Sequence, residues 1–324
     1  MSDKKIIAVV GATGAQGGGL ARAILDDPEG PFALRAITRD VDSPAARALA
    51  ERGAEVVKAD LDDEASVRAA FTGAYGAFVV TNFWAPLTPE QEAARDRARM
   101  ELDQAAIAAR AAEGTGLKHV VWSTLEDTRP HFAHLDTELP TLLYRYKVPH
   151  FDAKGEANLF FSSLNVPTTF LQTTMFYEAL LKSSGQGPQR DANGELVLSM
   201  PMGDKPLGLV AAEDIGRTAY GIFAAGERYV GRTVGLAGTH ATGTQLAELL
   251  GDVLGEKVTY RPITPDQLRA AGFPGAVEIG NMYQFYADAS DSFLTARDIE
   301  VARSLNPRLR TLADWLREHK DEIV

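Results

Sequence analysis

The chain opens with an apolar run, a glycine-spaced loop and a helical pattern that follow one another without a gap. The run Ile6–Val10 leads into Gly11-Ala12-Thr13-Gly14-Ala15-Gln16-Gly17, and the helical pattern continues to Leu25. Glycines at three-residue spacing allow a sharp turn, close approach of backbone N–H groups to a phosphate, and tight packing of helix on strand. The helix N-terminus adds partial positive charge. We therefore predict a βαβ unit whose loop binds the pyrophosphate of a dinucleotide; a purely structural glycine turn is the alternative.

The first 175 residues continue this alternation of short apolar runs and longer helical patterns, which is typical of a parallel sheet built from βαβ units. We expect strands at Ile6–Val10, Leu34–Thr38, Glu55–Lys58, Ala77–Val80, His119–Trp122 and Thr168–Leu171. We expect helices at Gly17–Leu25, Pro44–Arg52, Glu64–Phe71, Pro89–Ala112 and Phe151–Leu164. The irregular stretch Asp127–Pro149 between them predicts a loop or lid. The fold class is α/β, a Rossmann-type doubly wound parallel sheet.

Beyond about Phe176 the pattern is less regular and glycine and proline mark its turns. We expect helices at Ala212–Ala224, Thr244–Leu254, Pro265–Ala271 and Leu312–His319, and strands at Thr233–Leu236 and Lys257–Arg261. Residues 1–175 are thus predicted to form the NADP(H)-binding Rossmann domain. Residues 176–324 are predicted to form a smaller α+β region for a substrate or partner, packed with it as one unit.

The second strand ends at Ile37-Thr38-Arg39-Asp40, where such folds distinguish NAD from NADP. The planar guanidinium of Arg39 suits a ribose 2′-phosphate, so we expect NADP(H). If Asp40 occupied the ribose position instead, the preference would reverse; Arg39 as a solvated surface residue is a further alternative. Asp60, after the third strand, is placed either to accept from the adenine amino group or to cap the next helix.

The predicted fifth strand and the helix after it resemble the catalytic region of short-chain dehydrogenases, which carries a Ser and a Tyr-x-x-x-Lys pair. Ser123 fills the serine position and Lys154 the lysine position, but His150 stands four residues before Lys154. The step Val148-Pro149 should keep Tyr144 and Tyr146 off that helix. The usual proton donor is therefore missing.

Hydride transfer to a carbonyl needs an acid to protonate the developing alkoxide. His150 is able to supply that proton near neutral pH, but it is also able to serve as a polar residue lining a nicotinamide pocket without chemistry. Lys154 suits the nicotinamide ribose hydroxyls in both cases, or it is a solvated lysine at a helix start. The tentative catalytic set is His150, Ser123 and Lys154.

Composition limits the other possibilities. The formal charge of −11 and the lack of a basic aromatic stripe argue against direct nucleic-acid binding and against attraction to anionic lipid. The chain has no Cys, which excludes disulfides and thiolate chemistry and suits the cytoplasm. The opening apolar run is too short for a signal peptide or membrane span. No metal site is expected, because His131, His134 and Asp136 fit a solvated loop better than a ligand set.

Segments spread over nearly the whole chain resemble the NmrA-like family of atypical short-chain dehydrogenase relatives, in particular its NADP(H) redox-sensor branch. They are Gly-Ala-Thr-Gly-Ala-Gln-Gly-Gly at 11–18, Thr38-Arg39, Gly53-Ala54-Glu55-Val56-Val57, Thr81-Asn82-Phe83-Trp84, His150-Phe151-Asp152-Ala153-Lys154-Gly155-Glu156, Phe176-Tyr177-Glu178, Gly272-Phe273-Pro274-Gly275-Ala276 and Asp314-Trp315-Leu316.

The resemblance implies a set of residues that hold the cofactor. They are Gly11, Thr13, Gly14, Ala15, Gln16, Gly17, Arg39, Asp60, Leu61, Thr81, Asn82, Phe83, Lys154, Phe176, Tyr177 and Glu178. The chain departs from the family pattern at Ala94, where a basic residue is expected and Arg95 stands beside it. The loop Asp127–Pro149 is also longer than usual.

The resemblance further implies a regulator in which NADP(H) occupancy changes conformation, self-association or binding to a protein such as a transcription regulator or an enzyme. The alternative is an NADPH-dependent oxidoreductase that reduces quinones or similar acceptors, with His150 or Ser123 assisting. A scaffold that binds no dinucleotide is a third reading. The sequence leaves the partner, the acceptor and the oligomeric state open.

Overall fold

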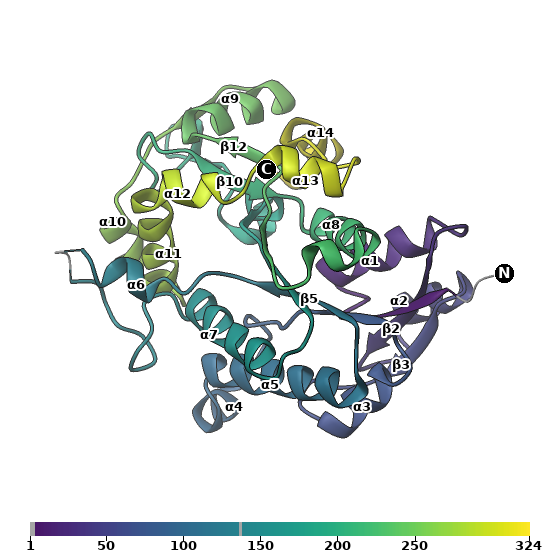
Figure 1. The fold of residues 1–324 in the computed structure, drawn as a ribbon. Helices are drawn as coiled ribbons and strands as arrows, with labels where there is room; N and C mark the ends of the chain where they lie inside the picture. Colours follow the sequence, from purple (N-terminus) through teal and green to yellow (C-terminus); the bar gives the residue numbers. More distant parts are fainter. Residues whose placement is uncertain (1–3, 136–137) are drawn as a thin grey trace.

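The computed structural model describes residues 4–135 and 138–324, and its centre is a parallel sheet of seven strands (Figure 1). The strand order is β11-β6-β5-β4-β1-β2-β3. These strands are β1 (Lys5–Val10), β2 (Phe32–Thr38), β3 (Glu55–Lys58), β4 (Gly76–Val79), β5 (His119–Thr124), β6 (Thr168–Gln172) and β11 (Thr233–Gly235). The predicted α/β class and doubly wound parallel sheet are confirmed.

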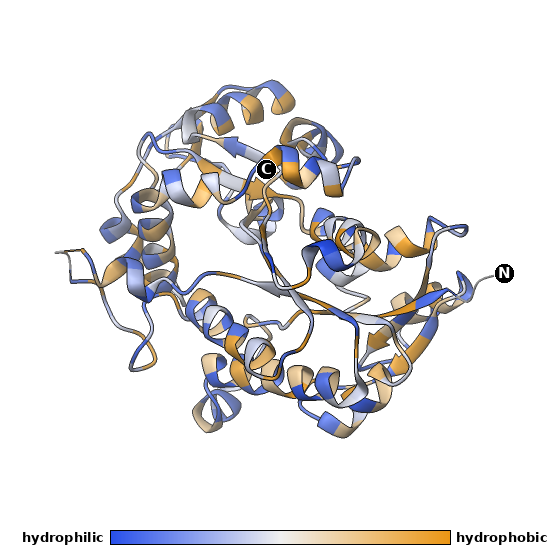
Figure 2. Ribbon diagram, viewed as in Figure 1, coloured by the Kyte–Doolittle hydropathy of each residue, from blue (hydrophilic) through white to orange (hydrophobic). Residues whose placement is uncertain are grey.

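Helices cover both faces of this sheet, as a parallel sheet requires. The helices described up to residue 224 are α1 (Ala15–Leu25), α2 (Pro44–Glu51), α3 (Glu64–Phe71), α4 (Pro89–Ala94), α5 (Arg97–Thr115), α6 (Arg129–Phe132), α7 (Pro149–Ser163) and α8 (Ala212–Ala224). One apolar core joins the sheet to α3, α5 and α7, and another joins it to α1 and α8. Figure 2 shows hydrophobic and hydrophilic residues alternating along these helices, as expected for helices with one face on a core.

Two glycines allow α1 and α8 to pack backbone against backbone. A Cβ atom on Gly19 would lie 2.1 Å from the carbonyl oxygen of Glu213, and one on Gly216 would lie 2.2 Å from that of Gln16. Any larger side chain at these positions would push the helices apart. Gly19 of α1 and Gly216 of α8 therefore fix how α8 packs on α1.

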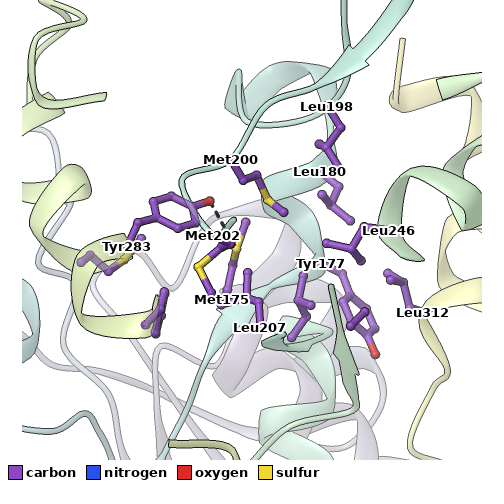
Figure 3. Packing of buried hydrophobic residues seen from close by; sticks show 14 of the residues in the cluster. Met175, Tyr177, Leu180, Leu198, Met200, Met202, Leu207, Leu246, Tyr283 and Leu312 are labelled. Carbon is purple, nitrogen blue, oxygen red and sulfur yellow. Dashed lines mark hydrogen bonds between the residues drawn. The ribbon is translucent and has the colours of Figure 1, made fainter. Parts of the chain in front are cut away.

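The C-terminal part of the chain builds a further apolar core, the C-terminal core, beside two small sheets, ordered β12-β10-β7 and β13-β9-β8. Its strands are β7 (Met175–Phe176), β8 (Gln189–Arg190), β9 (Leu196–Leu198), β10 (Leu207–Val210), β12 (Thr239–Ala241) and β13 (Val258–Tyr260). Its helices are α9 (Gly243–Leu254), α10 (Pro265–Arg269), α11 (Ala276–Asp288), α12 (Ser290–Thr295), α13 (Ile299–Leu305) and α14 (Leu312–Glu318). Figure 3 shows its packing, in which Met175, Met200 and Met202 lie among leucines and Tyr283. The predicted smaller α+β region is present.

The structure differs from the expected elements in several places, and helices α6, α12 and α13 and strands β7, β8, β9, β10 and β12 were not predicted. The strand predicted at Thr233–Leu236 forms, but it pairs with β6 and extends the main sheet instead of the smaller region. The single helix expected over Pro89–Ala112 is broken after α4, because the Asp96 side chain accepts from the Arg99 N–H and starts α5 anew. Helix α11 was not predicted. The division of the chain at residue 175 stays a prediction.

Apart from the short helix α6, the described residues of the stretch Asp127–Pro149 are largely irregular, and one buried carboxylate ties the stretch to α7. Asp152 accepts from the backbone N–H and the hydroxyl of Thr128, at 2.8 and 2.6 Å. It also accepts from the N–H groups of Lys147 and Val148, at 2.8 and 3.0 Å. Both ends of the stretch are thereby fixed to the first turn of α7. Burial raises the pKa of Asp152.

Candidate functional site

A cavity of about 570 Å³ lies at the carboxyl ends of the strands, where the strand order reverses between β1 and β4. Such a switch point is where open α/β sheets bind ligands. Most residues predicted to hold the cofactor line this cavity. They are Gly11, Thr13, Gly14, Ala15, Gln16, Gly17, Arg39, Asp60, Leu61, Thr81, Asn82 and Phe176.

The glycine loop between β1 and α1 has a backbone shape that side chains would prevent. Gly11 has φ of +66°, a conformation that L-residues rarely adopt. A Cβ atom on Gly17 would lie 2.5 Å from the carbonyl oxygen of Gly11. Gly14, the N-cap of α1, provides no side chain to cap the first N–H groups of that helix. The loop thus presents backbone donors to the cavity, and this cradle fits a pyrophosphate.

Arg39 and Asp40 both line the cavity at the end of β2, but their side chains differ in their partners. The Asp40 carboxylate accepts from the N–H of Asp42 at 2.9 Å. Among the residues that the structure describes, none forms a salt bridge or hydrogen bond with the exposed Arg39 guanidinium. The guanidinium is therefore the side chain of this pair that remains available for an anionic ligand.

Asp60 lines the cavity without capping a helix. Its carboxylate accepts from the N–H of Asp62 at 3.0 Å, while the N-cap of α3 is Asp63. The capping alternative for Asp60 is therefore wrong, and its contact with adenine stays a prediction. Arg95, the basic residue beside Ala94, binds both carboxylate oxygens of Asp62 at 2.8 and 3.0 Å. This hydrogen bond lowers the pKa of Asp62.

Lys154 reaches from α7 to the end of β4 and meets a buried carboxylate there. Its Nζ atom donates to Thr81 Oγ1 at 2.7 Å and lies 2.6 Å from Glu101 Oε1. Glu101 projects from α5, is fully buried and also accepts from the Thr81 hydroxyl. Its Oε2 atom has no hydrogen-bond partner among the described residues. Lys154 is thus a neutralised, well-fixed cation beside the cavity, unlike a solvated lysine.

Ser123 lies near the end of β5 and is buried. Its hydroxyl donates to Gln16 Oε1 of the phosphate loop at 2.7 Å. The three residues of the tentative catalytic set therefore differ in their surroundings: Ser123 faces the loop, Lys154 faces β4, and His150 faces α11.

His150 is held by Glu278. The carboxylate Oε1 atom lies 2.6 Å from the His150 Nδ1 atom and accepts from the His150 backbone N–H at 2.9 Å. The imidazole also lies against two aromatic rings, with centroid distances of 5.2 Å to Trp84 and 5.9 Å to Phe83. Trp84 is about half exposed, at 49%. We call His150, Trp84 and Phe83 together the aromatic wall. Phe83 and Trp84 directly follow the cavity residues Thr81 and Asn82 in the chain.

The two nearby tyrosines lie outside α7, as the proline step predicted. Helix α7 begins at Pro149, whereas Tyr144 is fully exposed with φ of 67°. Tyr146 is buried, and its hydroxyl accepts from Arg145 Nη2 at 2.7 Å. His150 therefore keeps the position four residues before Lys154.

Lys154 and three further predicted cofactor residues are not among the residues lining the cavity. Phe83, a member of the aromatic wall, is buried in a cluster with Ala98, Tyr146 and Ala153. Tyr177 lies in the C-terminal core (Figure 3), where its hydroxyl bonds Thr239 at 2.9 Å.

Glu178 accepts with both carboxylate oxygens from the N–H of Ala212 at the start of α8, at 3.2 Å each. Burial raises its pKa. None of Phe83, Tyr177 and Glu178 is among the residues lining the cavity, so their contacts with a cofactor stay predictions.

The sequence-based reasoning missed Glu101 and Glu278. Glu101 shares the face of α5 that carries Ala98, Leu102 and Ala105, so the 3.6-residue period places its carboxylate in the core. A buried carboxylate needs a cationic or donor partner, and that was the available signal. The signal in the sequence for Glu278 was weaker, because the helix that contains it was not predicted.

The histidines that were weighed as possible metal ligands have other surroundings. His131 packs edge-on against Phe132 and Phe285, and His134 is exposed. Asp136 lies outside the described residues. Among residues 4–135 and 138–324, no group of three or more potential ligands is placed to hold a metal ion. Phe285 and Tyr286 of α11 belong to the C-terminal core. The helices in the described part of the chain are all too short or too polar to cross a membrane.

The chain matches the NmrA-like family over residues 3–316. An NmrA-like family domain-containing oxidoreductase, FrzB of a Cladobotryum species, is 32% identical over 291 residues, which cover 86% of this chain and 83% of that protein. The solved structure of Nmra, a negative transcriptional regulator, superposes with a TM-score of 0.75 at 22% identity and covers 99% of this chain and 97% of its own. The NADPH-dependent quinone oxidoreductase of Escherichia coli, solved with NADPH, superposes with a TM-score of 0.69 at 22% identity, covering 96% and 99%.

Proposed function

The chain belongs to the NmrA-like family, and we propose that it is an NADPH-dependent oxidoreductase that reduces small, flat acceptors of the quinone class. The observation that carries the proposal is the cavity lining that runs from the glycine loop to Thr81, which Lys154 contacts, with Trp84 of the aromatic wall three residues further along the chain. A dinucleotide that extends from the glycine loop past Thr81 ends beside that wall.

The proposed cofactor contacts follow from the chemistry of the lining. The loop from Gly11 to Gly17 would hold the pyrophosphate, because its backbone N–H groups and helix terminus favour an anion. Arg39 would pair with the 2′-phosphate and Asp60 would accept from the adenine amino group. Lys154 would hold the hydroxyls of the nicotinamide ribose. NADPH supplies the hydride once it is bound.

The aromatic wall supports the choice of acceptor. Half-exposed Trp84 offers an indole face on which a planar ring is able to stack. Quinones accept hydride readily and depend less on an enzymic acid than aliphatic carbonyls do. A site without the usual tyrosine is better suited to such acceptors. The Cladobotryum relative is itself named an oxidoreductase.

The test is the oxidation of NADPH by a panel of quinones, followed by the loss of reduced nicotinamide absorbance. The wild-type protein should exceed the rate without enzyme, and Lys154→Ala should lose at least about tenfold in kcat/KM. Lys118→Ala, which removes an exposed lysine, is the matched control and should behave as wild type. Wild-type rates equal to the rate without enzyme for every acceptor would contradict the proposal.

A redox sensor is the second candidate, favoured by the replacement of the usual tyrosine by His150. In that function the occupancy of the site changes self-association or the binding of a protein. Light scattering with and without NADPH tests it on the same preparation. A change in mass without quinone turnover would favour the sensor over the enzyme.

A further inference from the structure

Glu278 contacts His150 through two hydrogen bonds that reach across 128 residues of sequence. The same carboxylate oxygen accepts from the backbone N–H of His150 and lies 2.6 Å from its Nδ1 atom. Glu278 is 9% exposed and His150 is 8% exposed, so bulk water competes little for these bonds. Since the carboxylate only accepts, the imidazole must carry a hydrogen on Nδ1.

The other ring nitrogen, Nε2, is left available. No described residue forms a hydrogen bond with His150 Nε2, and this atom is not among the fully enclosed polar atoms that lack a partner. A histidine whose Nδ1–H is held by a carboxylate presents Nε2 in a fixed direction for proton transfer. For Nε2 to donate, the ring must also carry a hydrogen there, as the imidazolium that the neighbouring Glu278 carboxylate stabilises.

The position of His150 relative to Lys154 places its imidazole one helical turn from the contact between Lys154 and the cavity residue Thr81. The two residues are separated by four positions on α7 and share one face of the helix. Lys154 bonds Thr81, which lines the cavity, while the imidazole packs on Trp84. His150 therefore lies one helical turn beyond Lys154, against the aromatic wall.

We propose that His150 donates the proton to the reduced acceptor through Nε2 and that Glu278 is its positioning residue, contributed by the C-terminal region. The proposal rests on the proposed oxidoreductase function. It also names the substrate class more closely: a planar quinone whose ring lies on Trp84 and whose carbonyl oxygen faces His150.

The proposed step transfers a hydride and a proton to the quinone. The quinone gains a hydride from bound NADPH, which leaves as NADP+, and negative charge develops on the quinone oxygen. The N–H bond at Nε2 breaks as an O–H bond forms on that oxygen, which gives the hydroquinone. His150 is left neutral with its Nδ1–H on Glu278, and a proton from solvent restores it. The carboxylate stabilises the charged imidazole before the transfer.

A merely structural pair that fastens α11 to α7 is the competing explanation, and two variants separate the two. His150→Gln removes the transferable proton, and the isosteric Glu278→Gln keeps an acceptor at the same place without its charge. His134→Gln and Glu300→Gln alter exposed residues and serve as matched controls. Thermal unfolding establishes that each variant is folded before kinetics are measured.

For the same quinone, we expect kcat to fall about 100-fold in His150→Gln and about tenfold in Glu278→Gln, the range of general acid catalysis. The KM and the calorimetric Kd for NADPH should stay within about twofold, because neither residue holds the cofactor. Proton NMR of the wild-type protein should show a far-downfield Nδ1–H resonance that is lost in both variants and kept in both controls.

Unchanged kcat in both folded variants, or a wild-type spectrum without that resonance, would overturn the role of the pair. Variants that unfold leave the NMR experiment on the wild-type protein as the deciding measurement. A wild-type protein that binds NADPH and shows the resonance but reduces no quinone would contradict the proposed function, and with it the substrate, while the geometry of the pair stands.

Discussion

The Nζ atom of Lys154 lies 2.6 Å from the Oε1 atom of Glu101, a carboxylate with no exposed surface. This pair joins α7 to α5 beside the cofactor cavity. Removing one member leaves the other charged and buried, which typically destabilises a protein by about 3–5 kcal/mol. Removing both avoids most of that loss.

We therefore predict that Lys154→Met lowers the free energy of unfolding by about 3 kcal/mol or more. Adding Glu101→Gln to Lys154→Met should restore most of the stability, but the double variant should still bind NADPH weakly. Urea titration and calorimetry measure the two effects separately. Equal stability of the single variant and wild type would show that the pair contributes nothing.

The contact between α1 and α8 predicts opposite results for neighbouring glycines. Gly19→Ala places a methyl group 2.1 Å from a backbone carbonyl oxygen and should destabilise the protein by about 1–3 kcal/mol. In Gly18→Ala the nearest atom is the flexible Arg22 guanidinium at 3.2 Å, so stability should change little or rise by about 0.5–1 kcal/mol. Thermal unfolding of the two variants checks this, and equal melting temperatures would refute the packing argument.

The burial of His119 predicts that the folded protein loses stability in acid. It is fully buried, and burial lowers its pKa to about 4. The Thr169 hydroxyl donates to the Tyr229 carbonyl, so His119 Nε2–H donates to Thr169 and Nδ1 is an enclosed atom without a described partner. A second proton on the ring would find no acceptor.

Between pH 6.5 and 4 the unfolded chain binds a proton at this histidine and the folded protein does not. The stability that neutral His119 provides is therefore complete above pH 6.5 and lost as the pH falls to about 4, by about 3 kcal/mol. His119→Gln should flatten the dependence of unfolding free energy on pH in this window. An identical slope in wild type and variant would count against the assignment.

The sheet and its glycine loop were predictable because they depend on local sequence. Strand Ile6–Val10, the loop from Gly11 to Gly17 and the helix after it follow one another directly, so period and composition suffice. The absence of tyrosine from the position four residues before Lys154 was likewise visible in the sequence, although the predicted helix began at Phe151 and α7 begins at Pro149.

The partners in the site were not predictable, because they come from distant parts of the chain. Glu101 and Lys154 are 53 residues apart, and His150 and Glu278 are 128 apart. A single sequence contains no signal that pairs such residues. The same reason applies to β11. The sequence predicted this strand, but it did not predict that the strand pairs with β6.

Arg39 offers the most direct test of the central claim that the cavity holds NADP(H). Calorimetric titration with NADPH and NADH should show tight NADPH binding by the wild-type protein and about 10- to 100-fold weaker NADPH binding by Arg39→Ala, with NADH binding unchanged. Arg47→Ala, an exposed arginine on α2 outside the cavity, is the control. Equal affinities of the wild-type protein for NADPH and NADH would contradict the assignment of Arg39, and binding of neither would contradict the cofactor site itself.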